Sequence, residues 1–239
     1  MLSTAVVLAA GRGTRMGALT RDTPKPLLPL QGRPILEHIL LGMRDAGIRR
    51  VLIVTGYLGE KIEHHFGDGA ALELELEYRR QHTTDGTARA LLLAQSCLED
   101  PFLMSWGDIV VERKLYRDLV NEFQRRPCDL LMSVNPVDDP WRGAAVYFDD
   151  DGRVTRLVEK PVRGTSSTSW NNAGVFIGSP LLLKYAERLQ PSSRGEYELP
   201  QAIAAMIDDG REVRAWRIEG YWSDLGTPED LAAAEHEYR

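Results

Sequence analysis

The pattern of apolar and polar positions in the first half of the chain predicts alternating strands and helices. Residues 3–9, 51–54 and 102–106 form mostly apolar runs, as expected for parallel strands covered on both faces. Residues 72–78 alternate leucine with glutamate, which is the two-residue period of a half-exposed strand. Apolar residues at helical spacing predict a helix from Pro34 to Gly47. Further helices are expected at 59–66, 87–98 and 114–125. This order predicts a mostly parallel sheet with right-handed crossovers.

The second half has shorter segments separated by turns. Residues 144–148 and 154–159 flank an Asp-Asp-Gly turn and predict a hairpin. The other elements expected are strands at 130–134, 172–177 and 213–218 and helices at 180–189, 199–208 and 227–238. No internal repeat or linker interrupts the chain, so we expect one domain over residues 1–239. The fold class predicted is α/β, a Rossmann-like three-layer sandwich with a mixed, mostly parallel central sheet and a smaller β lobe.

A glycine-rich loop follows the first strand and carries the strongest chemical signal. Residues 5–29 read AVVLAAGRGTRMGALTRDTPKPLLP, in which Gly11, Gly13, Arg15 and Lys25 stand together. Glycines let backbone N–H groups turn around an anion, while Arg and Lys neutralise its oxygens. No Gly-Lys-Ser/Thr follows, which excludes a P-loop, and the strand at 51–54 lacks the acid that would hold a ribose in a dinucleotide-binding protein. The loop therefore predicts a nucleoside triphosphate site.

Composition narrows the class of protein. The 239 residues are 43% hydrophobic and 27% charged, which is ordinary for a globular protein. The net charge of −6 argues against general binding to nucleic acid or to anionic membranes, because both need a positive field. No apolar run approaches the ~20 residues that span a bilayer, so we expect a cytoplasmic protein.

Two acids lie beside glycines near predicted strand ends, where ligands of open α/β sheets bind. Asp108 follows Trp106-Gly107, and Asp224 precedes Leu225-Gly226. Mg²⁺ in nucleotide enzymes is typically held by one or two carboxylates, with phosphate oxygens and waters completing the shell. Either acid alone could simply cap a turn, as Asp often does. As a pair, they predict a Mg²⁺ site.

The first strand, the loop GRGTRM and the segment PKP, in this order, resemble the sugar-1-phosphate nucleotidyltransferases. The segments EKP at 159–161, NAG at 172–174 and WSDLGTPEDL at 222–231 extend the resemblance over residues 6–231. It implies that residues 1–135 mainly bind the nucleotide and that residues 136–239 mainly bind the sugar phosphate. It also implies that Asp108 and Asp224 bind the metal.

The resemblance assigns roles residue by residue. Catalytic roles are implied for Arg15, Lys25 and Asp108. The implied nucleotide-binding residues are Ala9, Ala10, Gly11, Gly13, Thr14, Arg15, Lys25, Gln81, Gly86 and Thr87. The implied sugar-phosphate-binding residues are Gly143, Glu159, Lys160, Asn172 and Gly174. Gln81 and Gly86 stand in QHTTDGTARA, which is similar to the segment that reads the pyrimidine in thymidylyl- and uridylyltransferases. A Gln amide offers both a donor and an acceptor to an imide edge.

The implied reaction is Mg²⁺-assisted in-line attack of a sugar-1-phosphate on a nucleoside triphosphate, which gives a nucleotide sugar and pyrophosphate. The resemblance favours dTTP or UTP and a hexose-1-phosphate similar to glucose-1-phosphate. A mannose-1-phosphate guanylyltransferase is an alternative, because TPKPLLP and NAG also suit that branch. A non-catalytic regulator that binds nucleotide sugars is an alternative of another class, although such a protein would usually lose one of the phosphate or metal groups. The identity of the sugar and the formation of a homo-oligomer stay open.

Overall fold

A nine-stranded mixed sheet runs through the computed structural model, which describes residues 2–238. The strands are β1 (Thr4–Ala9), β2 (Pro29–Leu30), β3 (Arg33–Pro34), β4 (Arg50–Thr55), β5 (Glu75–Arg80), β6 (Phe102–Trp106), β7 (Ile109–Val111), β8 (Leu130–Pro136), β9 (Ala144–Phe148), β10 (Val154–Glu159), β11 (Trp170–Gly178), β12 (Val213–Arg217) and β13 (Trp222–Asp224). The α-helices are α1 (Ile35–Asp45), α2 (Gly59–Phe66), α3 (Thr87–Leu92), α4 (Lys114–Arg125), α5 (Pro180–Glu187), α6 (Leu199–Asp208) and α7 (Pro228–Glu237). Short 3-10 helices are η1 (Thr14–Thr20), η2 (Lys25–Leu27), η3 (Ala70–Leu72), η4 (Gln95–Cys97) and η5 (Pro140–Arg142).

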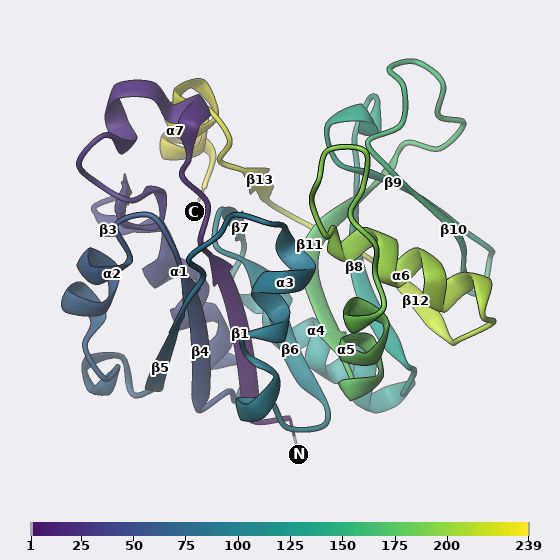
Figure 1. The fold of residues 1–239 in the computed structure, drawn as a ribbon, viewed down its shortest axis with the longest axis horizontal. Coiled ribbons are helices and arrows are strands. Elements are labelled where there is room, and N and C mark those ends of the chain that lie inside the picture. The colour runs from purple at the N-terminus through teal and green to yellow at the C-terminus, as the bar shows by residue number, and fades with distance from the viewer. Residues whose placement is uncertain (1, 239) are drawn as a thin grey trace.

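The order in which the chain adds strands to the sheet changes direction at β1. The main path of the sheet is β10-β9-β11-β6-β1-β4-β5, with β8 paired to β11 and β12 paired to β8 (Figure 1). Strands β6, β1, β4 and β5 are mutually parallel, whereas β11 runs antiparallel to β6 and to β8. The sheet is therefore mixed, which confirms the predicted α/β class. Because the chain passes from β1 to β4 on one side and returns as β6 on the other, a ligand crevice is expected at the carboxyl end of β1.

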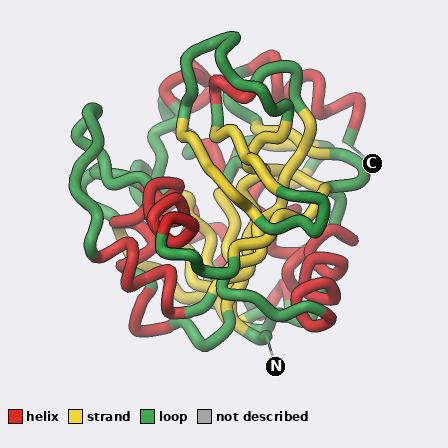
Figure 2. Tube along the Cα trace, turned by 90° about the vertical axis from the view of Figure 1, so that its right-hand side faces the viewer, coloured by secondary structure: helices red, strands yellow, loops and turns green. Residues whose placement is uncertain are grey.

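The strands form the middle layer and the helices cover both faces (Figure 2). Alternate residues of β1 point to opposite faces, so Val7 joins one buried cluster and Val6 joins the other. The first cluster includes side chains from α1, α2 and α4, and the second includes side chains from α3, α5 and α6. This double burial explains why β1 reads as a continuous apolar run in the sequence.

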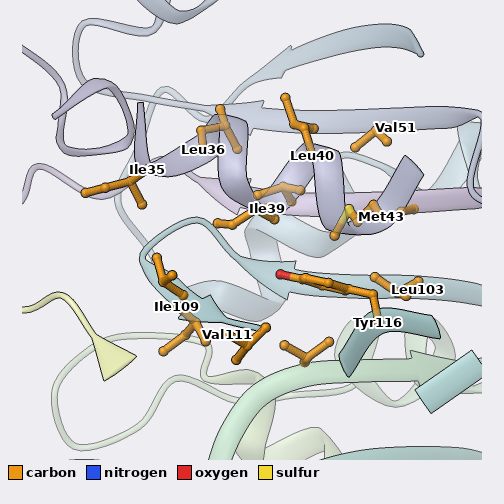
Figure 3. Close-up of a cluster of buried hydrophobic side chains, with 14 of the residues drawn as sticks. Ile35, Leu36, Ile39, Leu40, Met43, Val51, Leu103, Ile109, Val111 and Tyr116 are labelled. Atoms are coloured by element: carbon orange, nitrogen blue, oxygen red, sulfur yellow. The ribbon is translucent and has the colours of Figure 1, made fainter. Parts of the chain in front are cut away.

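The first cluster is closed by a contact between two helices. Ile35, Leu36, Ile39, Leu40 and Met43 of α1 point toward the sheet at the spacing predicted from sequence (Figure 3). The ring of Tyr116 from α4 lies beside them, fully buried. A Cβ at Gly42 would lie 2.4 Å from a Tyr116 ring carbon, so only glycine allows α1 to pack this closely on α4.

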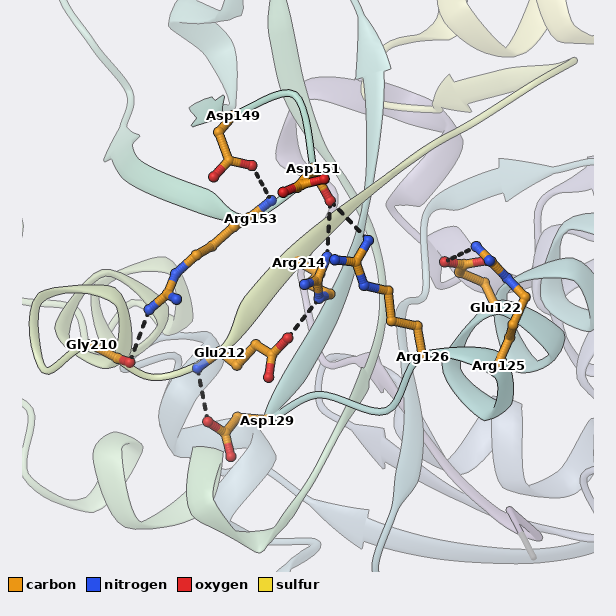
Figure 4. Close-up of polar contacts among 10 residues, drawn as sticks. All are labelled: Glu122, Arg125, Arg126, Asp129, Asp149, Asp151, Arg153, Gly210, Glu212 and Arg214. Carbon is orange, nitrogen blue, oxygen red and sulfur yellow. Dashed lines mark hydrogen bonds and ion pairs between the residues drawn. The ribbon is translucent and has the colours of Figure 1, made fainter.

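The turn between β9 and β10 is held in place by arginines that donate hydrogen bonds to backbone carbonyl oxygens. Arg126 and Arg214 both donate to the Asp151 carbonyl, at 3.2 and 2.9 Å (Figure 4). Arg153 donates to the Gly210 carbonyl at 3.2 Å, and Asp129 accepts from the Glu212 amide at 2.9 Å. These contacts fix the turn between β9 and β10 to β12. They therefore fix the position of the whole hairpin, whose other end carries Glu159.

Several predicted elements change in the structure. The strand predicted at 72–78 is wrong in position, because residues 70–72 form η3 and β5 begins at Glu75, in register with Arg50 of β4. The helix predicted at 87–98 ends at Leu92, and η4 follows it. The helix expected from Pro34 begins at Ile35 and ends at Asp45. The pairing of β7 with β13 was not predicted.

Candidate active site

The loop after β1 lies at the crevice that the strand order defines. Gly13 adopts φ 63°, and its carbonyl accepts from the Thr20 hydroxyl at 2.9 Å. Lys25 packs under the loop with 6% of its surface exposed, although it carries a charge. A small cavity of about 230 Å³ opens beside them. Its lining includes the predicted residues Ala9, Gly11, Gly13, Thr14, Arg15, Lys25 and Asp108.

Gly11 has no structural neighbour that would require glycine. A Cβ built there would meet no atom within 4 Å, apart from its chain neighbours. Gly11 is exposed and lines this small cavity. The missing side chain therefore leaves room for a ligand to approach the backbone, as the phosphate-loop interpretation requires.

The two predicted metal-binding acids meet, although 116 positions separate them in the sequence. In the pairing of β7 with β13, Asp224 lies opposite Ile109, and the Leu225 amide donates to the Asp108 carbonyl at 3.0 Å. The Lys25 ammonium lies between the two carboxylates, 2.8 Å from Asp108 Oδ2 and 3.9 Å from Asp224 Oδ1. Loop, lysine and both acids therefore form one cluster of charges.

The electrostatics of this cluster fit a cation held by the acids. Burial and the neighbouring Asp108 raise the pKa of Asp224 to about 6, against the opposing effects of Lys25 and Arg15. Asp224 Oδ1 is buried without a hydrogen bond inside residues 2–238. In the same part of the chain no cluster of three or more His, Cys, Asp or Glu is arranged to hold a metal. Two carboxylates suit Mg²⁺ that takes its remaining ligands from phosphate and water.

A larger cavity of about 900 Å³ joins the two halves of the chain. Predicted residues from both halves line it: Ala10, Gly11, Arg15, Gln81, Gly86, Thr87, Asp108, Gly143, Glu159, Lys160, Asn172 and Asp224. Gly174 does not line it. Gly174 adopts φ 82°, and a Cβ there would lie 2.1 Å from the ring of Trp106, which does line the cavity. The role of Gly174 in this structure is thus to let the Trp106 ring pack against β11.

The end of β10 presents an acid beside two cations. The side chain of Glu159 is 18% exposed, and its Oε1 lies 3.8 Å from Lys160 Nζ and 3.7 Å from Arg194 Nη2. Burial raises the pKa of Glu159, although Lys160 and Arg194 oppose this shift. Lys160 adopts the left-handed φ of 44°, which is unusual for a residue with a side chain, and its amide donates to the Gly143 carbonyl at 2.7 Å.

Two asparagines of β11 build the floor on this side. Asn171 accepts from the Ala144 amide at 3.2 Å and donates to Asn135 at 3.1 Å. A Cβ at Gly143 would lie 2.2 Å from Asn171 Oδ1, so close packing against Asn171 requires glycine at this position. Gly143 also lines the larger cavity. Asn172 accepts from the Gly174 amide at 3.1 Å, whereas its buried Nδ2 donates to nothing within residues 2–238. A free buried donor at a cavity wall is suited to a ligand oxygen.

Some residues of the site were not singled out from the sequence. Arg194 pairs with Glu159 and with Glu198. Trp106 lines the cavity, and its buried indole N–H has no hydrogen-bond partner within residues 2–238. Arg194 follows Ser192-Ser193 and precedes Gly195-Glu196, and a cation within such a polar segment before α6 is the signal that marks it in the sequence. Trp106 ends an apolar strand, where its spacing does not distinguish it from a core residue.

The fold and the site together define a class: an α/β protein with an anion-binding glycine loop and an adjacent pair of acids at the switch point of its sheet. Residues 4–239 match the nucleotidyl transferase family, and the chain belongs to this family. Membership confirms the resemblance that the loop and the PKP segment indicated.

Known relatives and structures agree with this assignment. The chain is 35% identical to the UTP–glucose-1-phosphate uridylyltransferase AglF of Haloferax volcanii, over 97% of its own length and 94% of the relative. It is also 35% identical to a glucose-1-phosphate thymidylyltransferase of Streptomyces antibioticus, over 95% of its length but only 64% of that relative. The structure of a UDP-glucose pyrophosphorylase complexed with UDP-glucose superposes with a TM-score of 0.89 at 20% identity, over 100% of this chain and 98% of the other. The last likeness shows the fold.

No helix among residues 2–238 is both long and apolar enough to cross a membrane.

Proposed function

We propose that the protein transfers a nucleotidyl group from a nucleoside triphosphate to a sugar-1-phosphate, and that UTP or dTTP and a sugar similar to glucose-1-phosphate are favoured. One observation carries the proposal: a single cavity is lined by Gln81 and Gly86 from the nucleotide half and by Glu159 and Lys160 from the sugar half. Arg15, Asp108 and Asp224, which belong to the cluster of charges around Lys25, line the same cavity. The names of the uridylyltransferase and thymidylyltransferase relatives support the same substrates.

The reaction makes one P–O bond and breaks another. An oxygen of the sugar phosphate attacks the α-phosphorus, and the bond from that phosphorus to pyrophosphate breaks, with both electrons leaving on pyrophosphate. A phosphate monoester has a second pKa of about 6 and is mostly dianionic at neutral pH. The attack therefore needs no general base, which agrees with a site that offers cations and N–H donors instead.

The residues of this chain would act by holding two anions together and neutralising the leaving group. The backbone at Gly11 and Gly13 would receive the triphosphate, and Arg15 would balance the charge that develops on pyrophosphate. Lys25, fixed by its ion pair with Asp108, would neutralise the reacting phosphates. Lys160 would hold the sugar phosphate at the other end of the cavity.

Asp108 and Asp224 would hold the Mg²⁺ that the family resemblance implies. When bound, the ion supplies positive charge to phosphate oxygens and orients them. Asp224 Oδ1 accepts no hydrogen bond within residues 2–238, and burial together with the neighbouring Asp108 raises the pKa of Asp224. Both observations support this role, because a poorly solvated pair of carboxylates is suited to a cation.

The test is pyrophosphate release by the purified protein with UTP, dTTP, GTP, CTP or ATP and a panel of sugar-1-phosphates that includes glucose-1-phosphate and mannose-1-phosphate. Lys25→Ala and Asp108→Ala should each lose at least ~100-fold in turnover, because each removes charge stabilisation from the transition state. Lys184→Ala, an exposed lysine of α5, is the matched control and should keep wild-type turnover.

Near-normal pyrophosphate release by Lys25→Ala would contradict the proposed role of the charge cluster. Absence of release from the wild-type protein with every pair of substrates, together with binding of a nucleotide sugar, would favour the regulatory alternative.

A further inference from the structure

The side-chain amide of Gln81 is held in one orientation by two acceptors. Gln81 follows β5 directly, and its amide N–H donates to the Thr55 carbonyl at 2.8 Å, so its backbone is fixed to β4. Its side chain reaches the wall of the larger cavity. There Nε2 donates to Asp85 Oδ1 at 2.9 Å and to the Gly86 carbonyl at 3.2 Å.

Chemistry determines which end of the Gln81 amide faces these partners. An amide nitrogen has two N–H donors and its oxygen has none, whereas an ionised carboxylate and a carbonyl only accept. The reversed amide would place Oε1 against two other oxygens and lose both hydrogen bonds. Nε2 is therefore fully used inside the protein. Oε1 makes no hydrogen bond within residues 2–238, and it is the group left for a ligand.

Asp85 is itself held in place by a distant segment. The Tyr197 amide donates to the Asp85 carbonyl at 2.8 Å, and the Ala88 amide donates to the Tyr197 carbonyl at 2.9 Å. Between them Gly86 adopts φ 115°, and a Cβ there would lie 2.3 Å from the Tyr197 carbonyl oxygen. This clamp, formed by residues 85–88 and Tyr197, sets the position from which the carboxylate reaches Gln81. Asp85 does not itself line the cavity.

We infer that Asp85 is a positioning residue that turns the oxygen of the Gln81 amide toward the base of the nucleotide, so that the site selects bases with a ring N–H. Uracil and thymine carry this donor at N3 and guanine carries it at N1, whereas cytosine N3 and adenine N1 are acceptors. An acceptor facing Oε1 would leave two lone pairs opposed, and a site built for a donor rejects such a base strongly. The inference rests on the proposed function and extends it from a preference for UTP or dTTP to a required hydrogen-bond donor on the base.

The experiment compares kcat/KM for UTP and CTP at a fixed concentration of glucose-1-phosphate. The wild-type protein should prefer UTP by at least ~100-fold. Asp85→Ala removes one of the two acceptors that hold Nε2, and the preference should fall by about tenfold, the equivalent of one hydrogen bond. Asp85→Asn is the matched control: its Oδ1 still accepts from Nε2, so the preference should stay within about threefold of wild type.

Readouts beside the ratio separate positioning from a structural role. The KM for glucose-1-phosphate should stay close to wild type in both variants, because Asp85 lies outside the cavity wall. The thermal midpoint should also change little, because the Tyr197 amide bonds the Asp85 backbone carbonyl, which both variants keep. The ratio of kcat/KM for UTP to that for CTP in the wild-type protein tests the orientation of the Gln81 amide without any variant.

Three results would overturn the inference and leave nucleotidyl transfer to a sugar-1-phosphate standing. They are efficient use of CTP by the wild-type protein, an unchanged ratio in Asp85→Ala, and an equal loss in Asp85→Asn, which would assign the effect to charge. Absence of pyrophosphate release with every triphosphate would instead end the proposed function and the inference together.

Discussion

Gly226 controls the position of Arg15 through its missing side chain. A Cβ at residue 226 would lie 2.9 Å from Arg15 Nη1, so the guanidinium occupies the space that a side chain at this position would need. Gly226→Ala should displace Arg15 and lower turnover by about tenfold, because small displacements of a charged group weaken stabilisation of the leaving group. Since a long side chain moves easily, the thermal midpoint should change little.

A double variant tests whether Gly226 acts through Arg15. Turnover of Arg15→Ala/Gly226→Ala should equal that of Arg15→Ala alone, because residues that act through one contact are not additive. Full additivity of the two losses would show that Gly226 has another role.

The sequence singled out the charged residues of the candidate site, but it did not indicate the direction of side chains at this site. Arg15, Lys25, Asp108 and Asp224 each stand in a local motif, so short-range patterns singled them out. The structure joins Lys25 to both acids by ion pairs and places Arg15 in the lining of the same cavity as Lys25 and Asp108. The orientation of Gln81 depends on a clamp with Tyr197, more than 100 positions away. No local pattern contains such a contact.

At the scale of elements, the start of α7 stabilises the segment that carries Asp224. The Thr227 hydroxyl accepts from the Asp230 amide at 3.2 Å, and Asp230 Oδ2 accepts from the Thr227 amide at 2.8 Å, which forms a capping box three residues after Asp224. Thr227→Ala should cost about 1 kcal/mol of unfolding free energy and lower the thermal midpoint by about 2–4 °C.

Thr227→Ser keeps the hydroxyl and serves as the control, with an expected midpoint close to wild type in the same calorimetric scan. An equal decrease in both variants would show that the methyl group of Thr227, rather than its cap, stabilises this region.

Long elements with a clear period were predicted well and short ones were not. The bounds of α2, α4 and α6 agree with the sequence, because apolar spacing and flanking breakers mark both ends. Strands β7 and β13 have three residues each, so they show no period. Their pairing joins two segments that lie far apart in the sequence. The positions of Asp108 and Asp224 were thus predictable, whereas the strand pair that joins them was not.

At the scale of the whole molecule, the two halves share one sheet by interleaving their strands. β8 ends the first half of the sequence, yet within residues 2–238 it pairs with β11 and β12, which both belong to the second half. β11 pairs with β6 on its other side. Likewise β7 from the first half pairs with β13 from the second. Neither half can complete its sheet alone, so the division into 1–135 and 136–239 should describe ligand binding and not independent folding.

We therefore expect urea to unfold the protein in a single transition, even though 239 residues is long for two-state behaviour. Four of the five tryptophans, Trp141, Trp170, Trp216 and Trp222, lie in the second half, so fluorescence reports mainly on that half. Far-ultraviolet circular dichroism reports on the helices of both. The two probes should give coincident midpoints, because loss of β11 removes the strand that links β6 to β8. A fluorescence transition at lower urea than the dichroism transition would show that the second half unfolds separately.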